Sequence, residues 1–261
     1  VGQLVQYRNN PNEKDGLREM ITRGEFGSFL CATGGFGEDE EQMEKNREYV
    51  NDLQRAAVEE SRLGIPLIFG KDVIHGHNTI YPIPIAMAAS FDPALVRECY
   101  SLTAGEAAND GIMWSFAPMI DLARDPRWGR CVEGTGEDPY LGAVMADAMV
   151  RGFQGDDPDD MSDHGKIAAC AKHYIGYGAA EGGRDYHKAE ISDYTLRNYY
   201  LRSFKGAVRA GVRTVMSSFN EISGQPVTSS HYLLTELLKD ELGFDGYVVS
   251  DDCSVVQLKR Q

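Results

Sequence analysis

The chain has 261 residues, of which 42% are hydrophobic and 25% are charged. This composition is ordinary for a globular protein, and the length allows one large core or two small ones. Lys and Arg number 26 against 40 Asp and Glu, so the net charge is −14. Nucleic acid and membrane partners are disfavoured, because anionic phosphates need cations to neutralise them. No apolar run approaches the roughly 20 residues of a transmembrane helix.

Short apolar runs rich in β-branched residues alternate with longer stretches of helical spacing. The predicted strands are, in chain order, Gly27–Cys31, Pro66–Phe69, Ile112–Ala117, Ile167–Tyr174, Arg213–Phe219 and Gly246–Ser250. The predicted helices are Glu38–Leu63, Pro93–Asn109, Pro139–Phe153, Ser192–Ala210 and Ser230–Leu242. This alternation indicates a parallel sheet whose strands are joined by crossover helices.

The fold class predicted from this pattern is α/β, a (β/α)8 TIM-like barrel. Nucleotide-binding versions of the layout lack support, because neither GxGxxG nor GxxxxGK[ST] follows a strand. The glycines within residues 34–37 are interpreted as a turn before the first helix. A barrel needs eight strands and six are counted, so we interpret the chain as a barrel truncated after about six β/α units, with two more expected beyond Gln261.

Polar and charged side chains gather at the predicted strand ends, where a β/α barrel builds its active site. In chain order they are Asp72, Asp121, Arg130, Lys172, His173, the segment Met216–Asn220, and Asp251. Because the carboxyl ends of parallel strands meet at one edge, these residues are expected to surround one site.

Four segments at these strand ends share a specific pattern. They read GKDVIHGHNTIYPIPIAMAASFD, APMIDLARDPRWGRCVEGTGEDPYL, CAKHYIGYGAAEGGRDY and GFDGYVVSDD. Together and in this order they resemble the N-terminal barrel of glycoside hydrolase family 3, and that of bacterial periplasmic β-glucosidases in particular. The similarity extends from about Val1 to Leu258, nearly the whole chain.

The resemblance implies a domain arrangement and a setting. Residues 1–261 would be the family's N-terminal barrel domain, incomplete at its C-terminus, and a second α/β domain would follow in the full-length enzyme. The implied substrate is a β-glucoside or oligosaccharide, with no cofactor. The implied location is periplasmic or secreted.

The resemblance also implies a retaining mechanism. One carboxylate attacks the anomeric carbon, and a carboxylic acid about 5–5.5 Å away protonates the leaving oxygen. By its place in the family's Ser-Asp motif, Asp251 is the implied nucleophile. The alternative for this carboxylate is a cap on the following helix. Asp252 stands where the family more often has Trp, Tyr, Cys or His, and is interpreted as a residue of the rim.

Sugar binding is assigned by the same resemblance to Asp72, Arg130, Lys172, His173 and Arg184. Such side chains hold hydroxyl groups through charge-assisted hydrogen bonds, and the cations would also keep Asp251 ionised by lowering its pKa. Xyloside-specific members commonly carry Glu in the motif EALHG, where this chain has the shorter Asp72 in KDVIHG. The space left by Asp favours a β-glucoside over a β-xyloside.

Other residues of these segments have structural interpretations. Arg124, Asp125 and Glu133 are expected to form buried ion pairs, and Trp128 is either a packing residue or a sugar platform.

No metal site is expected, because His75 and His77 lack a third ligand at suitable spacing. The cysteines lack CxxC spacing and are interpreted as buried or partly buried free thiols. They are Cys31, Cys99, Cys131, Cys170 and Cys253.

Three departures from the family pattern concern the chemistry. Phe219 replaces a frequent tyrosine, and Cys253-Ser254 replaces a frequent Gly-Ala. In most of the family the acid is a glutamate of the second domain. In some periplasmic β-glucosidases a glutamate six residues after the nucleophile has been considered for this role, but here that position is Gln257, which cannot donate a proton usefully. The chain alone is therefore expected to hydrolyse an ordinary glucoside poorly.

Several alternatives remain open besides a family 3 β-xylosidase. A family 3 β-N-acetylglucosaminidase would take its acid from an Asp–His pair, for which Asp185 and His187 are candidates, although extra residues precede the aspartate. A catalytically inactive sugar-binding barrel would keep the sugar-binding residues without an acid. A barrel enzyme for a phosphate-bearing substrate is less favoured, because no Gly-rich phosphate cradle follows the predicted strands.

Overall fold

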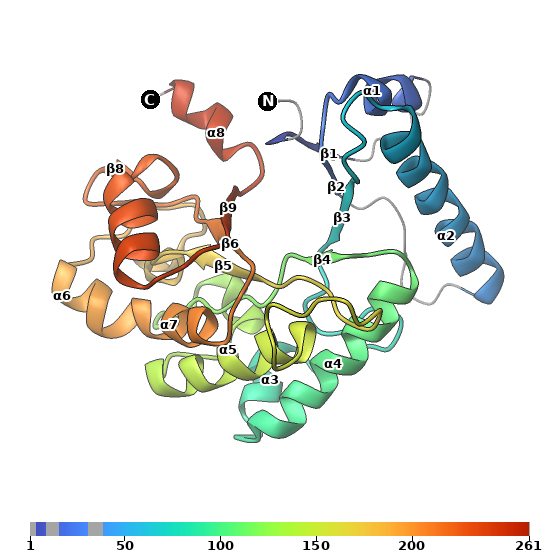
Figure 1. Cartoon of the computed structure of the whole chain (residues 1–261). Coiled ribbons are helices and arrows are strands. Elements are labelled where there is room, and N and C mark those ends of the chain that lie inside the picture. The colour runs from blue at the N-terminus through green and yellow to red at the C-terminus, as the bar shows by residue number, and fades with distance from the viewer. Residues whose placement is uncertain (1–3, 9–15, 31–38, 261) are drawn as a thin grey trace.

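Parallel strands lie side by side at the centre of the molecule (Figure 1), and the computed structural model describes them within residues 4–8, 16–30 and 39–260. They are β1 (Gln6–Arg8), β2 (Ser28–Leu30), β3 (Ile68–Lys71), β4 (Trp114–Ser115), β5 (Cys170–Tyr174), β6 (Thr214–Ser217) and β9 (Tyr247–Ser250). Their order is β1-β2-β3-β4 and β5-β6-β9, with every neighbouring pair parallel. Parallel bridges from Trp114 to Ala168 and from Met119 to Lys172 join the two groups.

This arrangement confirms the α/β class and the barrel-like order of strands along the chain. All six predicted strands are present, and the described residues hold one further parallel strand, β1, that was not predicted. That strand has only three residues and a single apolar side chain, Tyr7, so it has no readable alternation. β1 and β9 are the two outermost strands of this order. Arg8 ends β1, and its Nη1 lies 3.4 Å from Oδ2 of Asp252, which follows β9.

Helices connect the strands and lie outside them. They are α1 (Leu17–Arg23), α2 (Glu40–Arg55) with a wider turn at Ala56–Glu60, α3 (Pro84–Ala88), α4 (Pro93–Asn109), α5 (Pro139–Gln154), α6 (Asp193–Thr195), the turn Leu196–Tyr200, α7 (Leu201–Arg209), the helix Tyr232–Glu241 and α8 (Ser254–Gln257). A small antiparallel hairpin, β7 (Glu221–Ile222) and β8 (Gln225–Pro226), follows β6. The sequence did not predict the short α1 and α3.

Helix starts follow ordinary capping chemistry. The carboxylates of Asp39, Asp92 and Asp138 accept backbone N–H groups at the first turns of α2, α4 and α5. Pro93 and Pro139 come next, where their fixed φ suits the first helical turn and no N–H is needed. These signals explain why the predicted start of each of these two helices matches the observed one.

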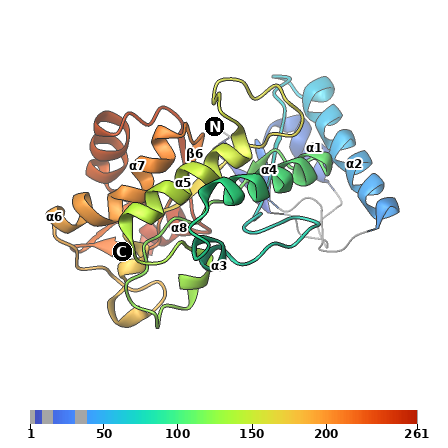
Figure 2. The same ribbon diagram turned by 90° about the horizontal axis from the view of Figure 1, so that it is seen from below.

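The helices α4, α5 and α7 pack side by side over one face of the strands (Figure 2). Glycines allow the close approach. A Cβ on Gly152 of α5 would lie 2.7 Å from the Arg97 carbonyl oxygen, and one on Gly206 of α7 would lie 2.2 Å from that of Ala143. Inside the strands, Trp114, Cys170 and other apolar side chains form a separate cluster. This packing fixes the strand ends that carry the polar residues.

Two expectations fall outside the described residues: the thiol of Cys31 and the glycine turn at 34–37. Of the other cysteines, Cys99 and Cys131 are partly buried free thiols and Cys170 is a buried one, as predicted, whereas the free thiol Cys253 is exposed and the prediction of burial is wrong for it.

Candidate active site

Four ionisable residues predicted from the sequence lie at the carboxyl ends of three strands. Asp72 directly follows β3, Lys172 and His173 belong to β5, and Asp251 directly follows β9. These strands are not sequence neighbours, but the barrel order brings their ends to one side of the sheet. The structure thus gathers residues that are up to 179 positions apart, from Asp72 to Asp251.

Lys172 and Asp72 form a direct ion pair. The Nζ of Lys172 lies 2.7 Å from Oδ1 of Asp72. The lysine side chain is only 5% exposed, whereas that of Asp72 is 54% exposed. A buried ammonium with one carboxylate partner keeps further donor protons available. The pair is therefore a fixed donor next to a reachable acceptor, which suits a ligand with several hydroxyl groups.

His173 lies between two carboxylates. Oδ2 of Asp121 accepts the backbone N–H of His173 at 2.9 Å and lies 2.8 Å from Nδ1 of its ring. On the opposite edge of the ring, Nε2 lies 3.6 Å from Oδ2 of Asp251. Burial lowers the pKa of His173 well below its ordinary value of 6.5, so the ring is neutral at neutral pH.

Asp251 is the carboxylate that combines burial with access. Its side chain is 14% exposed, and Oδ1 accepts the backbone N–H of Asp252 at 2.7 Å. Burial raises its pKa to about 6, although that N–H and the charges of Lys172 and Arg130 act in the opposite direction. The helix-capping alternative finds no support, because the cap position of α8 is Cys253, no side chain caps this helix, and Oδ1 of Asp251 accepts from Asp252 instead.

Arg130 is fixed by a bidentate ion pair with Glu133. Its Nε and Nη2 donate to the two carboxylate oxygens at 2.8 and 3.0 Å. Although burial by itself raises the pKa of Glu133, this pairing brings it below its usual range. The guanidinium also stands 5.7 Å from the ring centroid of Tyr177, whose ring in turn contacts that of His173. Arg130 is thus held beside the cluster by charge on one side and an aromatic face on the other.

The buried ion pairs predicted for this loop are present only in part. Glu133 pairs with Arg130 and Asp125 pairs with Arg127 at 2.6 Å, but neither pair is buried: Glu133 is 30% exposed and Arg127 is 71% exposed. Arg124 was expected in an ion pair, but its guanidinium lies over the Tyr199 ring at 5.2 Å. Trp128 is completely buried. It is a packing residue and not an open sugar platform.

Arg184 makes no hydrogen bond or ion pair with the cluster among the described residues. Its side chain is exposed, and the hydrogen bond it makes within the described ranges is a 3.5 Å contact to the Glu181 carbonyl oxygen. The acid–histidine alternative also lacks its contact: Asp185 accepts the Trp128 indole N–H at 2.9 Å, and no hydrogen bond joins it to His187 in the part of the chain that the structure describes.

The turn after Asp251 carries backbone strain. Cys253 has φ 58° and ψ 6°, the left-handed region that favours glycine. The family often has glycine at this position. Cys253 therefore replaces the glycine but keeps a left-handed backbone conformation that glycine adopts easily. Asp252 is 63% exposed and faces Arg8, consistent with a place at the rim.

The histidines after Asp72 have structural partners. Nδ1 of His75 lies 2.8 Å from the Tyr81 carbonyl oxygen, and Nε2 of His77 lies 2.7 Å from Oδ2 of Asp110. Among the residues placed by the structure, no three His, Cys, Asp or Glu side chains come together as a metal site.

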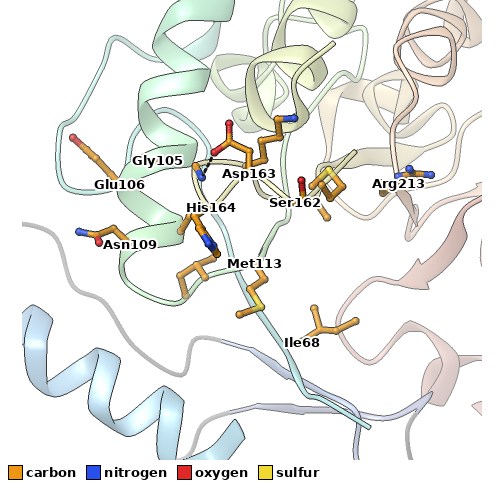
Figure 3. A pocket seen from close by; sticks show the side chains of 15 residues that line it. Ile68, Gly105, Glu106, Asn109, Met113, Ser162, Asp163, His164 and Arg213 are labelled. Atoms are coloured by element: carbon orange, nitrogen blue, oxygen red, sulfur yellow. Dashed lines mark hydrogen bonds between the residues drawn. The ribbon is translucent and has the colours of Figure 1, made fainter. Parts of the chain in front are cut away.

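A groove of about 920 Å³ lies at the other end of the strands (Figure 3). Ile68 begins β3, Met113 precedes β4 and Arg213 precedes β6, so the groove is at the amino ends. Its polar residues include Glu106, whose carboxylate already accepts hydrogen bonds from Thr79. The buried charged cluster, by contrast, is at the carboxyl ends of the strands.

Asp121 is a residue of the cluster that the sequence did not assign. It was noted at a strand end but not included among the sugar-binding or catalytic residues, and the structure makes it the partner of His173. The sequence signal for Asp121 was its position after the third predicted strand. Many residues of a barrel follow a strand, so this position alone does not single it out.

The fold and this cluster define a parallel β/α-barrel protein with a charged site at the carboxyl ends of its strands. The chain belongs to glycosyl hydrolase family 3: the model of the family's N-terminal domain matches residues 1–261.

Among curated relatives, the chain is 38% identical over 259 residues to a periplasmic beta-glucosidase of Salmonella typhimurium, covering 99% of the chain and 32% of the relative. A beta-xylosidase of Formosa agariphila is 35% identical over 223 residues, covering 81% of the chain and 31% of the relative. The crystal structure of a beta-glucosidase from Listeria innocua in complex with glucose matches with a TM-score of 0.89 and 36% identity, covering 99% of this chain and 36% of that one. The chain spans about one third of the length of these relatives.

Proposed function

We propose that this chain is the nucleophile-bearing barrel of a retaining β-glucosidase, which acts at non-reducing ends through a covalent glycosyl–Asp251 intermediate. The observation that carries the proposal is the position of Asp251. It directly follows β9, is 14% exposed, and lies 3.6 Å from His173. The charges of Lys172 and Arg130 favour its ionised form. A carboxylate held in this way can attack an anomeric carbon.

The sugar ring would be held by the residues around the nucleophile. Asp72 and Lys172 offer an acceptor and a donor already aligned with one another. Arg130 offers a donor face fixed by Glu133. Arg184 is proposed only as an outer residue of the loop, because its side chain is exposed and hydrogen-bonds the Glu181 carbonyl oxygen.

The proton donor is proposed to come from a second, C-terminal α/β domain of the full-length enzyme. The family resemblance places a glutamate there, and Gln257 in this chain cannot serve as an acid. Substrates whose leaving group departs without protonation should therefore test the barrel chemistry separately from the acid. A periplasmic or secreted location is proposed from the Salmonella typhimurium relative, and none of the described helices is long and apolar enough to cross a membrane.

A β-xylosidase is the second candidate, because a relative with that name is 35% identical. We expect 2,4-dinitrophenyl 2-deoxy-2-fluoro-β-D-glucoside to label the protein at least about tenfold faster than the corresponding xyloside, since a filled hydroxymethyl pocket is worth about 1–3 kcal/mol. Asp72→Glu should reverse or abolish this preference, because the added methylene occupies the space near C5. Labelling is followed by intact mass.

The matched control for this substitution is Asp252→Glu, which lengthens an exposed acid of the rim by the same methylene. It should leave the glucoside preference unchanged. Faster labelling by the xyloside in the unmodified protein would favour the β-xylosidase, and faster labelling by a 2-acetamido sugar would favour the β-N-acetylglucosaminidase.

The rate of labelling should depend on pH through Asp251. Only the ionised carboxylate attacks, and burial has raised its pKa to about 6. The rate is therefore expected to be constant above that pH and to fall about tenfold for each unit below it. Labelling rates between pH 4.5 and 8 measure this acidic limb of the pH–rate profile, and circular dichroism verifies folding at each pH. A rate that stays constant down to pH 4.5 would contradict the assignment.

A further inference from the structure

Asp121 is a buried carboxylate for which the proposed chemistry gives no role. Its side chain is only 1% exposed, so little of it is open to solvent or to a ligand. A single oxygen, Oδ2, makes both of its hydrogen bonds, one to the backbone N–H and one to the ring Nδ1 of His173. Burying an ionisable group is costly unless it is hydrogen-bonded or paired. The role of this carboxylate is therefore sought in its hydrogen bonds to His173.

The backbone fixes Asp121 in this position. The extended segment after β4 pairs with β5: Ile120 donates its N–H to the Lys172 carbonyl oxygen at 2.8 Å, and Lys172 donates to that of Pro118 at 3.0 Å. Three other charged side chains face the carboxylate from the same loop and strand. They are Arg130, Glu133 and Lys172. Burial raises the pKa of Asp121 to about 7, partly offset by the His173 N–H and the two cations.

The ring of His173 is neutral, so it carries one proton on one of its two nitrogens. Nδ1 lies 2.8 Å from Asp121, within hydrogen-bond distance, whereas Nε2 lies 3.6 Å from Asp251, outside it. Oδ2 of Asp251 is buried and receives no hydrogen bond within the described residues. The proton is therefore stabilised at Nδ1 and finds no equivalent partner at Nε2.

We infer that Asp121 is a positioning residue that holds His173 in its Nδ1–H form, so that Nε2 and the neighbouring Asp251 oxygen present two acceptors to a ligand hydroxyl. A carboxylate that fixes the tautomer of a functional histidine is a recurring device. The two acceptors lie 3.6 Å apart. A sugar hydroxyl entering between them supplies the missing donor, whereas an acceptor-only group such as an ether oxygen is repelled.

The hydroxyl-bearing ligand depends on the proposed function, but the tautomer is a property of the free protein. Long-range ¹H–¹⁵N correlation spectra of the ¹⁵N-histidine-labelled chain at pH 8.5 measure it directly, with His173→Gln to assign the signal. His77 is an internal control of the opposite kind, because its Nε2 lies 2.7 Å from Asp110. We expect the proton on Nδ1 of His173 and on Nε2 of His77. A proton on Nε2 of His173 would overturn the inference.

Two variants separate positioning from folding. Asp121→Asn keeps an oxygen acceptor and should retain the Nδ1–H form, whereas Asp121→Ala should populate Nε2–H and weaken glucose binding roughly tenfold, the size of one lost hydrogen bond. The spectrum of the unmodified chain decides the matter even if the alanine variant does not fold. A His173 proton on Nδ1 without any glucose binding would contradict the proposed function but leave this inference standing. Glucose binding with the proton on Nε2 would overturn this inference but leave the proposed function standing.

Discussion

Replacing Asp251 by alanine is expected to slow the release of dinitrophenolate from 2,4-dinitrophenyl β-D-glucoside by about 10⁴-fold or more, as for the loss of other catalytic nucleophiles. The leaving group needs no proton, so this loss isolates the attack on the anomeric carbon from acid assistance. The matched control is Asp252→Ala, because Asp252 is the neighbouring carboxylate and is 63% exposed. Its rate should stay within about threefold of the unmodified protein.

Azide sharpens the same experiment. In Asp251→Ala the anion can occupy the place of the carboxylate and attack the sugar from that side. Release of dinitrophenolate should then recover in proportion to azide concentration, and the product should be α-glucosyl azide, which NMR identifies by its anomeric coupling. A β-glucosyl azide, or an Asp251→Ala variant as fast as the unmodified protein, would show that another group attacks.

Replacing Lys172 by methionine is expected to weaken glucose binding by roughly 100-fold, because a hydrogen bond to a charged group is worth about 1.5–3 kcal/mol. Lys172 is 5% exposed and pairs with Asp72 at 2.7 Å, so the substitution removes a donor that no other described side chain supplies to Asp72. Methionine keeps much of the side-chain volume in the buried strand. Isothermal titration with glucose measures the loss.

The same variant should change the pH dependence of labelling. The charge of Lys172 lowers the pKa of Asp251, so its removal raises that pKa above about 6. The acidic limb of the labelling rate therefore moves to higher pH. Lys205→Met is the matched control, because Lys205 is an exposed residue of α7. Unchanged glucose affinity and an unchanged limb in Lys172→Met would remove Lys172 from the site.

Sequence patterns predicted the helices and strands whose ends or apolar spacing are marked by neighbouring residues. The helix α4 was predicted with its observed bounds, because Asp92 and Pro93 mark its start and its apolar spacing is regular. By contrast, β1 is held by contacts with residues that follow it in the chain, including the stacking of Tyr7 on Phe26 at 4.9 Å. A three-residue strand of this kind carries no period of its own, so only the folded structure identifies it.

The site was predictable as a set of strand-end residues but not as a network. The strand order of a barrel is enough to expect Asp72, Lys172 and Asp251 near one another, and the first two are in direct contact. The direction of a loop side chain depends on how the loop packs, and for this reason the exposed position of Arg184 was not foreseen. The hold of Asp121 on His173 depends on a bridge between non-neighbouring segments, which no sequence spacing reveals.

The central claim is that Asp251 forms a covalent bond with the sugar. The most direct measurement is incubation with 2,4-dinitrophenyl 2-deoxy-2-fluoro-β-D-glucoside, followed by intact mass and fragmentation of the tryptic peptide that spans residues 240–259. We predict one fluoroglucosyl group per chain, located on Asp251. An adduct on another carboxylate, or glucose binding without any adduct, would contradict the claim, and the second result would identify the chain as a sugar-binding barrel.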